Sequence, residues 1–310
     1  MKVFIAGANG MVGSALASAY LSTNNALLIP SRKELDYFDY SATSEYFLEM
    51  KPDLIIDAAA IVGGINANDA NPVKFLEDNL TIQNNLMRAA HSAQVPKFVF
   101  LGSSCIYPRN SIQPIKEEYL MTGPLEETNS AYAIAKIAGV ELINSYRKQY
   151  GYSWISLMPT NIYGRKDNFD LINSHVFPAL VRRFIEASEN DAERVILWGS
   201  GSALREFLHV DDLASAIVLA AEKYNSSTHI NIGTGEDISI KELAQKIAIA
   251  TGYSGKIEWD SSKPDGTPRK VLDVSRIHAL GWKPTITLDE GIATTIAWYR
   301  KANARGEVRK

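Results

Sequence analysis

The first thirteen residues constrain the fold of this chain more than any other stretch. A short apolar run at residues 3–6 leads into Gly7-Ala-Asn-Gly10-Met-Val-Gly13, and a helix pattern covers residues 11–21. A strand, a glycine turn and a helix in this order form the context of a dinucleotide-binding loop, because glycines let the backbone approach a pyrophosphate. The spacing differs from the ordinary Gly-x-Gly-x-x-Gly fingerprint, so in isolation it would equally fit a tight turn. Its place at the first strand–helix junction favours cofactor binding.

Further short apolar runs alternate with amphipathic stretches through the first half of the chain. The runs predict strands, at residues 3–6, 26–29, 54–58, 98–101 and 154–158. The longer stretches predict helices, at residues 11–21, 73–95 and 132–150. Such alternation is typical of a doubly wound parallel sheet with helices on both faces. We therefore expect an α/β fold of the Rossmann type.

Beyond Gly164 the alternation weakens. Helices are expected over residues 175–186, 214–224, 240–251 and 288–302, with short strands at 195–198 and 229–232. This part predicts a smaller α/β domain that closes over the edge of the sheet, where small-molecule sites tend to form. The expected division is a cofactor-binding domain of residues 1–165, with a returning segment near 206–224, and a mainly substrate-binding domain of residues 166–310.

The loop after the second expected strand indicates which cofactor is bound. An NAD site wants an acidic residue there for the ribose hydroxyls, but the chain offers Pro30-Ser31-Arg32-Lys33. A hydroxyl and a guanidinium suit a 2′-phosphate, because arginine binds phosphate with a bidentate fork. The alternative is that Arg32 and Lys33 form a solvated loop end. The sequence thus favours NADP(H) over NAD.

A tyrosine and a lysine one helical turn apart form the second candidate site. Tyr132 and Lys136 lie on the same face of the expected helix. A phenol has a pKa of about 10, and a nearby ammonium favours the phenolate, so we expect Lys136 to lower the pKa of Tyr132. The pair would then serve as proton donor and acceptor opposite a carbonyl oxygen. By itself the pattern more often marks two half-exposed residues on an amphipathic helix.

Composition narrows the classes of function. The 310 residues carry a net charge of −3, which argues against general nucleic-acid binding. No apolar run approaches the length of a membrane span, and the start is not that of a signal peptide. The single cysteine excludes an intramolecular disulfide and fits a reducing cytoplasm. The long helix at residues 73–95 is a candidate for subunit contact.

In their order along the chain, the glycine loop, Ser103 and Tyr132-x-x-x-Lys136 resemble the extended short-chain dehydrogenase/reductase family. The resemblance runs over the whole length and is closest to members that act on a GDP-linked 4-keto-6-deoxy-mannose. The stretches that carry it are Val62-Gly-Gly-Ile65, Leu101-Gly-Ser-Ser-Cys-Ile-Tyr-Pro108, Tyr132-Ala-Ile-Ala-Lys-Ile-Ala-Gly139, Met158-Pro-Thr-Asn-Ile-Tyr-Gly164, Asn173-Ser-His175, Trp198-Gly-Ser-Gly201, Arg205-Glu-Phe-Leu-His-Val-Asp-Asp212 and Lys263-Pro-Asp-Gly-Thr-Pro-Arg269. One departure is Asn9, where some relatives carry a basic residue. We therefore expect Arg32 to provide more of the binding of the adenosine phosphate.

The resemblance implies a reaction in two parts, inversion at C3 and C5 of the sugar and then reduction of the C4 ketone with NADPH. Ser103 and Tyr132 would hydrogen-bond the C4 oxygen, with Lys136 supporting Tyr132. Cys105 and His175 would be the base and acid of the inversion. Alternation along an extended chain would turn Ser103 and Cys105 the same way, and a nearby cation would help form the thiolate. The alternatives are a small buried hydrophobe for Cys105 and a helix-capping residue for His175.

The resemblance also implies the binding residues. For NADP(H) they are Gly7, Asn9, Gly10, Met11, Val12, Gly13, Ser31, Arg32, Ala58, Ala59, Leu101, Gly102, Ser103, Tyr132, Lys136, Pro159, Thr160, Asn161, Ile162 and His175. For the GDP-sugar substrate they are Ser104, Asn161, Arg183, Trp198, Arg205, Lys263 and Asp265. No metal site is expected, because His209, Asp211 and Asp212 have no second His or Cys at ligand spacing and are interpreted as structural.

Two other functions compete with this interpretation. One is a different nucleotide-sugar epimerase or dehydratase of the same family, which would recycle tightly held NAD; a dehydratase would typically place paired carboxylates where Ser-Ser-Cys stands. The other is a redox-sensing protein that holds NADP without turnover, which would generally lack Tyr132 or Lys136. The expected partners are the GDP-sugar and a second copy of the chain in a homodimer, with no nucleic acid and no membrane.

Overall fold

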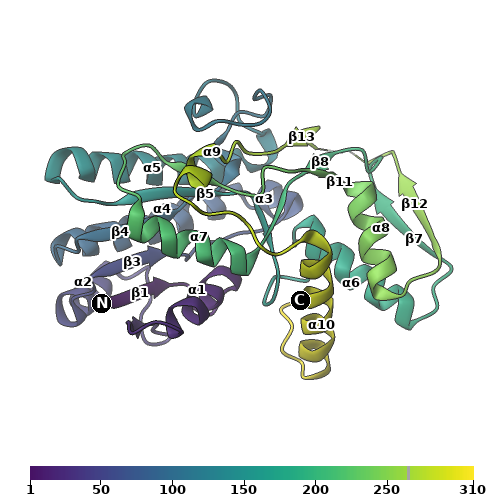
Figure 1. Cartoon of the computed structure of the whole chain (residues 1–310), viewed down its shortest axis with the longest axis horizontal. Coiled ribbons are helices and arrows are strands. Elements are labelled where there is room, and N and C mark those ends of the chain that lie inside the picture. Colours follow the sequence, from purple (N-terminus) through teal and green to yellow (C-terminus); the bar gives the residue numbers. More distant parts are fainter. Residues whose placement is uncertain (264–265) are drawn as a thin grey trace.

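A parallel sheet of six strands forms the larger part of the protein (Figure 1). The structure is a computed structural model, and it describes residues 1–263 and 266–310. The strand order is β10-β5-β4-β3-β1-β2. The strands are β1 (Lys2–Ala6), β2 (Ala26–Leu28), β3 (Leu54–Asp57), β4 (Lys97–Leu101), β5 (Ile155–Pro159) and β10 (Ile230–Ile232). The expected doubly wound fold is confirmed.

Helices cover both faces of this sheet. One face carries α2 (Tyr40–Met50), α4 (Pro72–Ser92) and α5 (Ser130–Tyr150), which pack side by side, and the other carries α1 (Met11–Leu21) and α7 (Val210–Lys223). The short α3 (Ile65–Ala70) precedes α4, and α9 (Ser275–Ala279) packs beside β10. Covering a sheet on both faces explains why its strands are continuous apolar runs rather than alternating ones.

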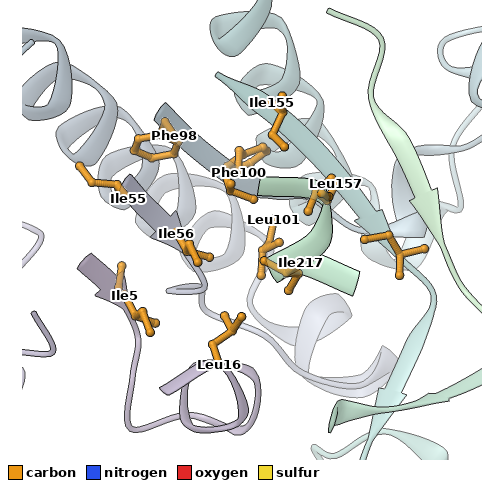
Figure 2. Close-up of a cluster of buried hydrophobic side chains, with 14 of the residues drawn as sticks. Ile5, Leu16, Ile55, Ile56, Phe98, Phe100, Leu101, Ile155, Leu157 and Ile217 are labelled. Carbon is orange, nitrogen blue, oxygen red and sulfur yellow. The ribbon is translucent and has the colours of Figure 1, made fainter. Parts of the chain in front are cut away.

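The main hydrophobic core lies between the sheet and these helices. Figure 2 shows strand side chains such as Ile5, Ile56 and Leu101 converging with Leu16 of α1 and Ile217 of α7. Phe98 and Phe100 are fully buried in the same core. Burial of each such side chain contributes roughly 1.5–3 kcal/mol, so the sheet is the rigid part on which the loops at its edge depend.

A second, separate core lies in the C-terminal half. It packs α6 (Val176–Glu189), α8 (Ile240–Thr251) and α10 (Leu288–Ala304) with the parallel pair β7 (Arg194–Trp198) and β12 (Lys256–Asp260). Ser239 and Thr287 each form a capping box with the glutamate three residues later, which fixes where α8 and α10 begin. Phe177, Phe184 and Ile247 lie inside this core.

Small sheets and turns complete the chain. β6 (Asn161–Tyr163) pairs with β9 (Phe207–His209), and β8 (Leu204–Arg205) lies between β11 (Ile238–Ser239) and β13 (Arg269–Lys270). Figure 1 shows β8, β11 and β13 between the large sheet and the second core. Three short 3₁₀ turns cover Ser104–Ile106, Glu117–Tyr119 and Glu127–Asn129. Within the described residues, no helix has the length and apolar character needed to cross a membrane.

Three expectations about elements are corrected. The strand expected at 229–232 lies not in the C-terminal part but at the edge of the main sheet, paired with β5. A run as short as Ile-Asn-Ile does not reveal its partner. Helices α2 and α3, of 11 and 6 residues, were not expected from the sequence. Helix α7 begins at Val210 rather than at residue 214, because the His209 side chain accepts a hydrogen bond from the Asp211 N–H at its start.

Candidate active site

The glycine loop between β1 and α1 forms a cradle for a phosphate. Gly7 has φ +73°, and a Cβ added there would lie 2.7 Å from the Ala58 carbonyl oxygen. A Cβ on Gly13 would lie 2.2 Å from the Gly7 oxygen, so only glycine fits either position. Gly10 caps α1 without a side-chain hydrogen bond, which leaves the first N–H groups of the helix directed at the loop. The loop and the bordering Ala58 and Ala59 therefore fit a dinucleotide.

The residues expected to select NADP(H) lie on the loop after β2. Arg32 is exposed, and its guanidinium carbon lies 5.7 Å from the centre of the Phe38 ring. The Ser31 N–H donates to a Glu34 carboxylate oxygen at 2.6 Å, which was not anticipated. Asn9 is exposed on the glycine loop.

Ser103, Tyr132 and Lys136 meet where β4 ends and α5 begins. The Lys136 ammonium donates to the Leu101 carbonyl oxygen at 2.9 Å and lies 5.9 Å from the centre of the Tyr132 ring. Burial raises the pKa of Tyr132 above its usual value, and a hydrogen bond from Ser103 acts in the opposite direction. The lowered pKa expected for Tyr132 is wrong in this structure, because desolvation of the phenol is the largest effect and raises the pKa.

Asp57 is a site neighbour that the sequence did not reveal. It ends β3 with 1% of its surface exposed, in register with Phe100 of β4, and the ammonium of Lys136 lies 4.8 Å from the centre of the Phe100 ring. Burial raises the pKa of Asp57 to about 6, and the charge of Lys136 works against that rise. Burial in turn lowers the pKa of Lys136, and Asp57 counters it. The two groups form a buried pair of opposite charge; an acid at the end of an apolar strand was the available signal.

The turn after β4 corrects the expectation for Cys105. Ser104–Ile106 is a 3₁₀ turn rather than an extended segment, and the Ser103 hydroxyl accepts a hydrogen bond from the Cys105 N–H at 3.2 Å. Strand alternation therefore does not relate the two side chains. The Cys105 sulfur accepts hydrogen bonds from the Asn129 side-chain amide at 3.5 Å and from the Lys270 ammonium at 3.6 Å. Ser104, expected to touch the substrate, is buried.

His175 occupies the position before α6, but its side chain makes no capping hydrogen bond. The helix-capping alternative is therefore not supported. Although the residue is exposed overall, desolvation of its ring, followed by the charge of Lys270, lowers the pKa of His175. The segment before it packs tightly against residues 62–65: the Gly64 N–H donates to the Asn173 oxygen at 2.7 Å. A Cβ on Gly64 would lie 2.3 Å from the Ser174 oxygen.

The residues expected to bind substrate are dispersed around the second core. The Asn161 amide donates to the Glu206 carbonyl oxygen at 2.8 Å, and Arg183 donates to the Ile196 oxygen at 3.0 Å. Trp198 is 57% exposed, with the Lys263 ammonium 5.7 Å from its ring centre. A Cβ on Gly266 would lie 3.6 Å from Arg205, which places the loop before β13 beside that guanidinium. Asp265 lies outside the described residues.

The acidic residues near α7 have structural partners. Asp211 forms an ion pair with Arg165 at 2.6 Å, and Asp212 accepts hydrogen bonds from the backbone of Thr285 and Ile286. The Asp212 contacts attach residues 285 and 286 of the C-terminal part to α7. Over residues 1–263 and 266–310, no group of three or more His, Cys, Asp or Glu side chains is arranged to hold a metal ion.

Comparison with known proteins agrees with this geometry. Residues 3–233 match the model of the NAD dependent epimerase/dehydratase family. The chain is 50% identical over 308 residues to the GDP-L-fucose synthase of Escherichia coli K12, covering 96% of each chain. It is 50% identical over 299 residues to a putative GDP-L-fucose synthase of Arabidopsis thaliana, covering 96% of this chain and 91% of the relative. A solved GDP-mannoheptose C4 reductase from Campylobacter jejuni with NADP bound superposes with a TM-score of 0.89 at 38% identity, over 96% and 98% of the two chains. The chain therefore belongs to the NAD dependent epimerase/dehydratase family.

Proposed function

We propose that this protein converts GDP-4-dehydro-6-deoxy-D-mannose to GDP-L-fucose, by inversion at C3 and C5 followed by NADPH-dependent reduction at C4. The observation that carries the proposal is the Cys105 sulfur, held between Asn129 and Lys270 beside the Ser103–Tyr132–Lys136 group. Relatives named GDP-L-fucose synthase, 50% identical over nearly their whole lengths, support the substrate. A simple reductase has no use for a second proton-transfer group at this place.

The residues divide the chemistry between them. Both carbons to be inverted neighbour the C4 ketone, so removal of a proton gives an enolate whose oxygen needs stabilisation. Ser103 and Tyr132 donate hydrogen bonds to that oxygen, while Cys105 removes the proton and His175 returns one on the opposite face. In the reductive step Tyr132 gives the C4 oxygen its proton. The glycine loop and Arg32 would hold NADP(H), which supplies the hydride when bound.

The two hydrophobic cores support a division of the chain into a cofactor-binding and a substrate-binding domain. Residues 1–165, with the returning segment 206–224, would form the cofactor-binding domain, and most of residues 166–310 would bind the GDP-sugar. We include β10 and α9 in the first of these units, because β10 belongs to the main sheet and α9 packs beside it. We further propose a cytoplasmic homodimer that pairs α4 and α5 of each copy.

One assay tests the proposal. Purified protein is incubated with GDP-4-keto-6-deoxy-mannose and NADPH, and the product is identified by NMR. We expect one NADPH oxidised per GDP-L-fucose formed, with a higher kcat/KM for NADPH than for NADH. Turnover without net NADPH oxidation would instead indicate an epimerase or dehydratase that recycles its cofactor. A reduced product that keeps the original configuration at C3 and C5 would remove the epimerase half.

The roles of Cys105 and His175 are separable. Cys105→Ser keeps the shape of the side chain but supplies no comparable anion at neutral pH. In deuterated water we expect this variant to show little exchange at C3 and C5 while it still reduces the unepimerised ketone. A His175→Gln variant should retain some exchange, because deprotonation survives the loss of the acid. Normal deuterium incorporation in Cys105→Ser would show that another residue is the base.

A further inference from the structure

Two nitrogen donors converge on the sulfur of the only cysteine in the chain. The Lys270 ammonium lies 3.6 Å from the Cys105 sulfur, and the side-chain amide nitrogen of Asn129 lies 3.5 Å from the same sulfur. A neutral thiol is a weak acceptor, whereas a thiolate accepts several such donors, and a cation beside it favours the charged form. The two contacts thus match the state of the sulfur that removes a proton.

We infer that Lys270 is the positioning residue that activates Cys105 as the base of the inversion, with Asn129 as the second donor to the thiolate. This inference rests on the proposed function, which supplies the reaction that needs the base. Lys270 acts through the sulfur rather than on the reacting carbon. Sequence reasoning expected a cation near Cys105 but did not identify it, because the two residues lie 165 positions apart.

The backbone around Lys270 is fixed from several sides. Its carbonyl oxygen accepts the Glu206 N–H at 3.3 Å, and the next residue, Val271, accepts the Ile115 N–H at 2.8 Å. The fully buried Glu206 carboxylate accepts the Leu272 N–H at 2.9 Å. Ile115 belongs to the loop that follows the Cys105 turn, so the segments carrying the lysine and the cysteine are hydrogen-bonded to one another. A flexible side chain is thereby aimed from a rigid base.

The same ammonium also acts on His175, the other member of the pair. After desolvation, the charge of Lys270 is the next cause that lowers the pKa of His175. An imidazolium beside a second cation is a stronger proton donor, whereas a thiol beside a cation loses its proton more readily. The one ammonium therefore favours the thiolate form of the base and makes a protonated His175 the stronger proton donor.

The proton balance of one inversion is then complete. The Cys105 thiolate takes the proton from the carbon beside the ketone, and the C–H electron pair moves to form the enolate, with its charge on the C4 oxygen. The His175 imidazolium gives a proton to the opposite face of that carbon, which restores the ketone. Cys105 is left as a thiol and His175 as neutral imidazole, and solvent exchange returns one proton from the sulfur to the ring before the second inversion.

The first experiment measures the thiol directly, without substrate. Because Cys105 is the only cysteine, its alkylation by iodoacetamide is read on the intact chain by mass spectrometry. At pH 7 we expect Lys270→Met to be alkylated roughly tenfold more slowly than wild type, because the thiolate is the nucleophile and the variant lacks the cation beside it. Lys270→Arg should recover most of the rate, and all forms should converge near pH 10. Lys256→Met, at an exposed position of β12, is the matched control and should react like wild type.

Equal alkylation of wild type and Lys270→Met at pH 7 would overturn the inference, as would a tenfold difference that persists at pH 10, since that reports access rather than ionisation. The second experiment follows deuterium exchange at C3 and C5 and NADPH oxidation together. We expect Lys270→Met to lose exchange at least tenfold more than reduction of the unepimerised ketone. Equal loss of both would assign Lys270 to substrate binding. If wild type shows neither exchange nor NADPH oxidation, the proposed function fails, while the alkylation result still decides the Lys270–Cys105 coupling.

Discussion

At the residue scale, burial of Tyr132 determines whether its phenol acts as a proton donor. Its raised pKa keeps the phenol protonated at neutral pH. A phenol of this kind is a donor, which is the role that an enolate oxygen or a newly formed alkoxide requires. The hydrogen bond from Ser103 favours the charge that develops when the proton leaves, and the Lys136 ammonium lies 5.9 Å from the centre of the ring.

Replacing this phenol tests the reductive step. Tyr132→Phe keeps the ring that packs edge-on against Phe75 but removes the proton donor. We expect the rate of ketone reduction to fall by roughly 10²–10⁴-fold with the fold unchanged, since that is the usual contribution of a positioned acid. Single-turnover oxidation of NADPH measures the rate, and circular dichroism serves as the control. Turnover at the wild-type level would end the assignment.

The buried pair Asp57–Lys136 predicts a pH-dependent stability. The folded-state pKa of Asp57, about 6, lies above the ordinary value of 3.8, so the folded chain binds an extra proton between these values. Stability contributed by that proton is complete below about pH 4 and is lost as the pH rises through 6. Asp57→Asn removes this loss. We therefore expect the free energy of unfolding of the variant, measured against wild type, to be up to about 3 kcal/mol higher at pH 8 than at pH 4.

Urea denaturation at both pH values measures this difference. Glu141→Gln, an exposed carboxylate on α5, is the control and should follow the wild-type curve. The Asp57→Asn variant should also lose activity, because Lys136 no longer has a buried anion near it. Parallel stability curves for wild type and Asp57→Asn would contradict the prediction.

The sequence predicted those site residues whose motifs are local. Ser103, Tyr132 and Lys136 lie within 34 positions of one another and meet at one strand end. Lys270 was missed because it reaches the site from a strand whose neighbours only the tertiary structure defines. Asn129 directly precedes α5 and Asp57 ends an apolar strand, but neither motif was used as a signal. The extended geometry assumed for Ser103 and Cys105 failed because the Ser103 hydroxyl bonds the Cys105 N–H and closes a turn instead.

At the scale of elements, α5 carries Tyr132 and Lys136 and packs closely against β4 at Gly139. Gly139 faces the Phe100 ring, and a Cβ there would lie 2.3 Å from the ring carbon Cζ. The missing side chain at Gly139 therefore sets how close Tyr132 and Lys136 lie to the sheet, and a single added methyl group would change that distance.

Gly139→Ala tests this seating. The added methyl should push α5 away from β4 and destabilise the fold by about 1–3 kcal/mol, even though alanine favours a helix over glycine by about 1 kcal/mol. Activity should fall as well, because both site residues move with the helix. Thermal denaturation and kcat are measured beside Ser145→Ala, an exposed position on the same helix. An unchanged melting temperature in Gly139→Ala would show that the sheet accommodates the methyl.

Elements with strong local signals were predictable and those without were not. Apolar runs predict the buried strands, and amphipathic stretches predict the long helices α4 and α5. The two-residue strands β8, β11 and β13 carry no pattern, because their existence depends on pairing across the chain. Those strands place Arg205 and Lys270, which is why the substrate side of the site was harder to predict than the cofactor side.

For the whole molecule, α4 and α5 present a face suited to a second copy. Val73 on α4 is 70% exposed and Ile134 on α5 is 49% exposed. Pairing these helices across a two-fold axis would bury such side chains in a four-helix contact. Multi-angle light scattering at micromolar concentration should give the mass of a dimer. Ile134→Glu should shift it toward monomer, and a wild-type monomer would contradict the proposal.

The sixth strand of the main sheet also bears on how the protein is made. β5 ends at Pro159, and its neighbour β10 ends at Ile232, so about seventy residues must be synthesised between them. At about 5–20 residues per second the ribosome needs roughly 4–15 seconds for that stretch. During this time the edge of β5 that faces away from β4 has no partner, and an open strand edge of this kind can pair with another chain.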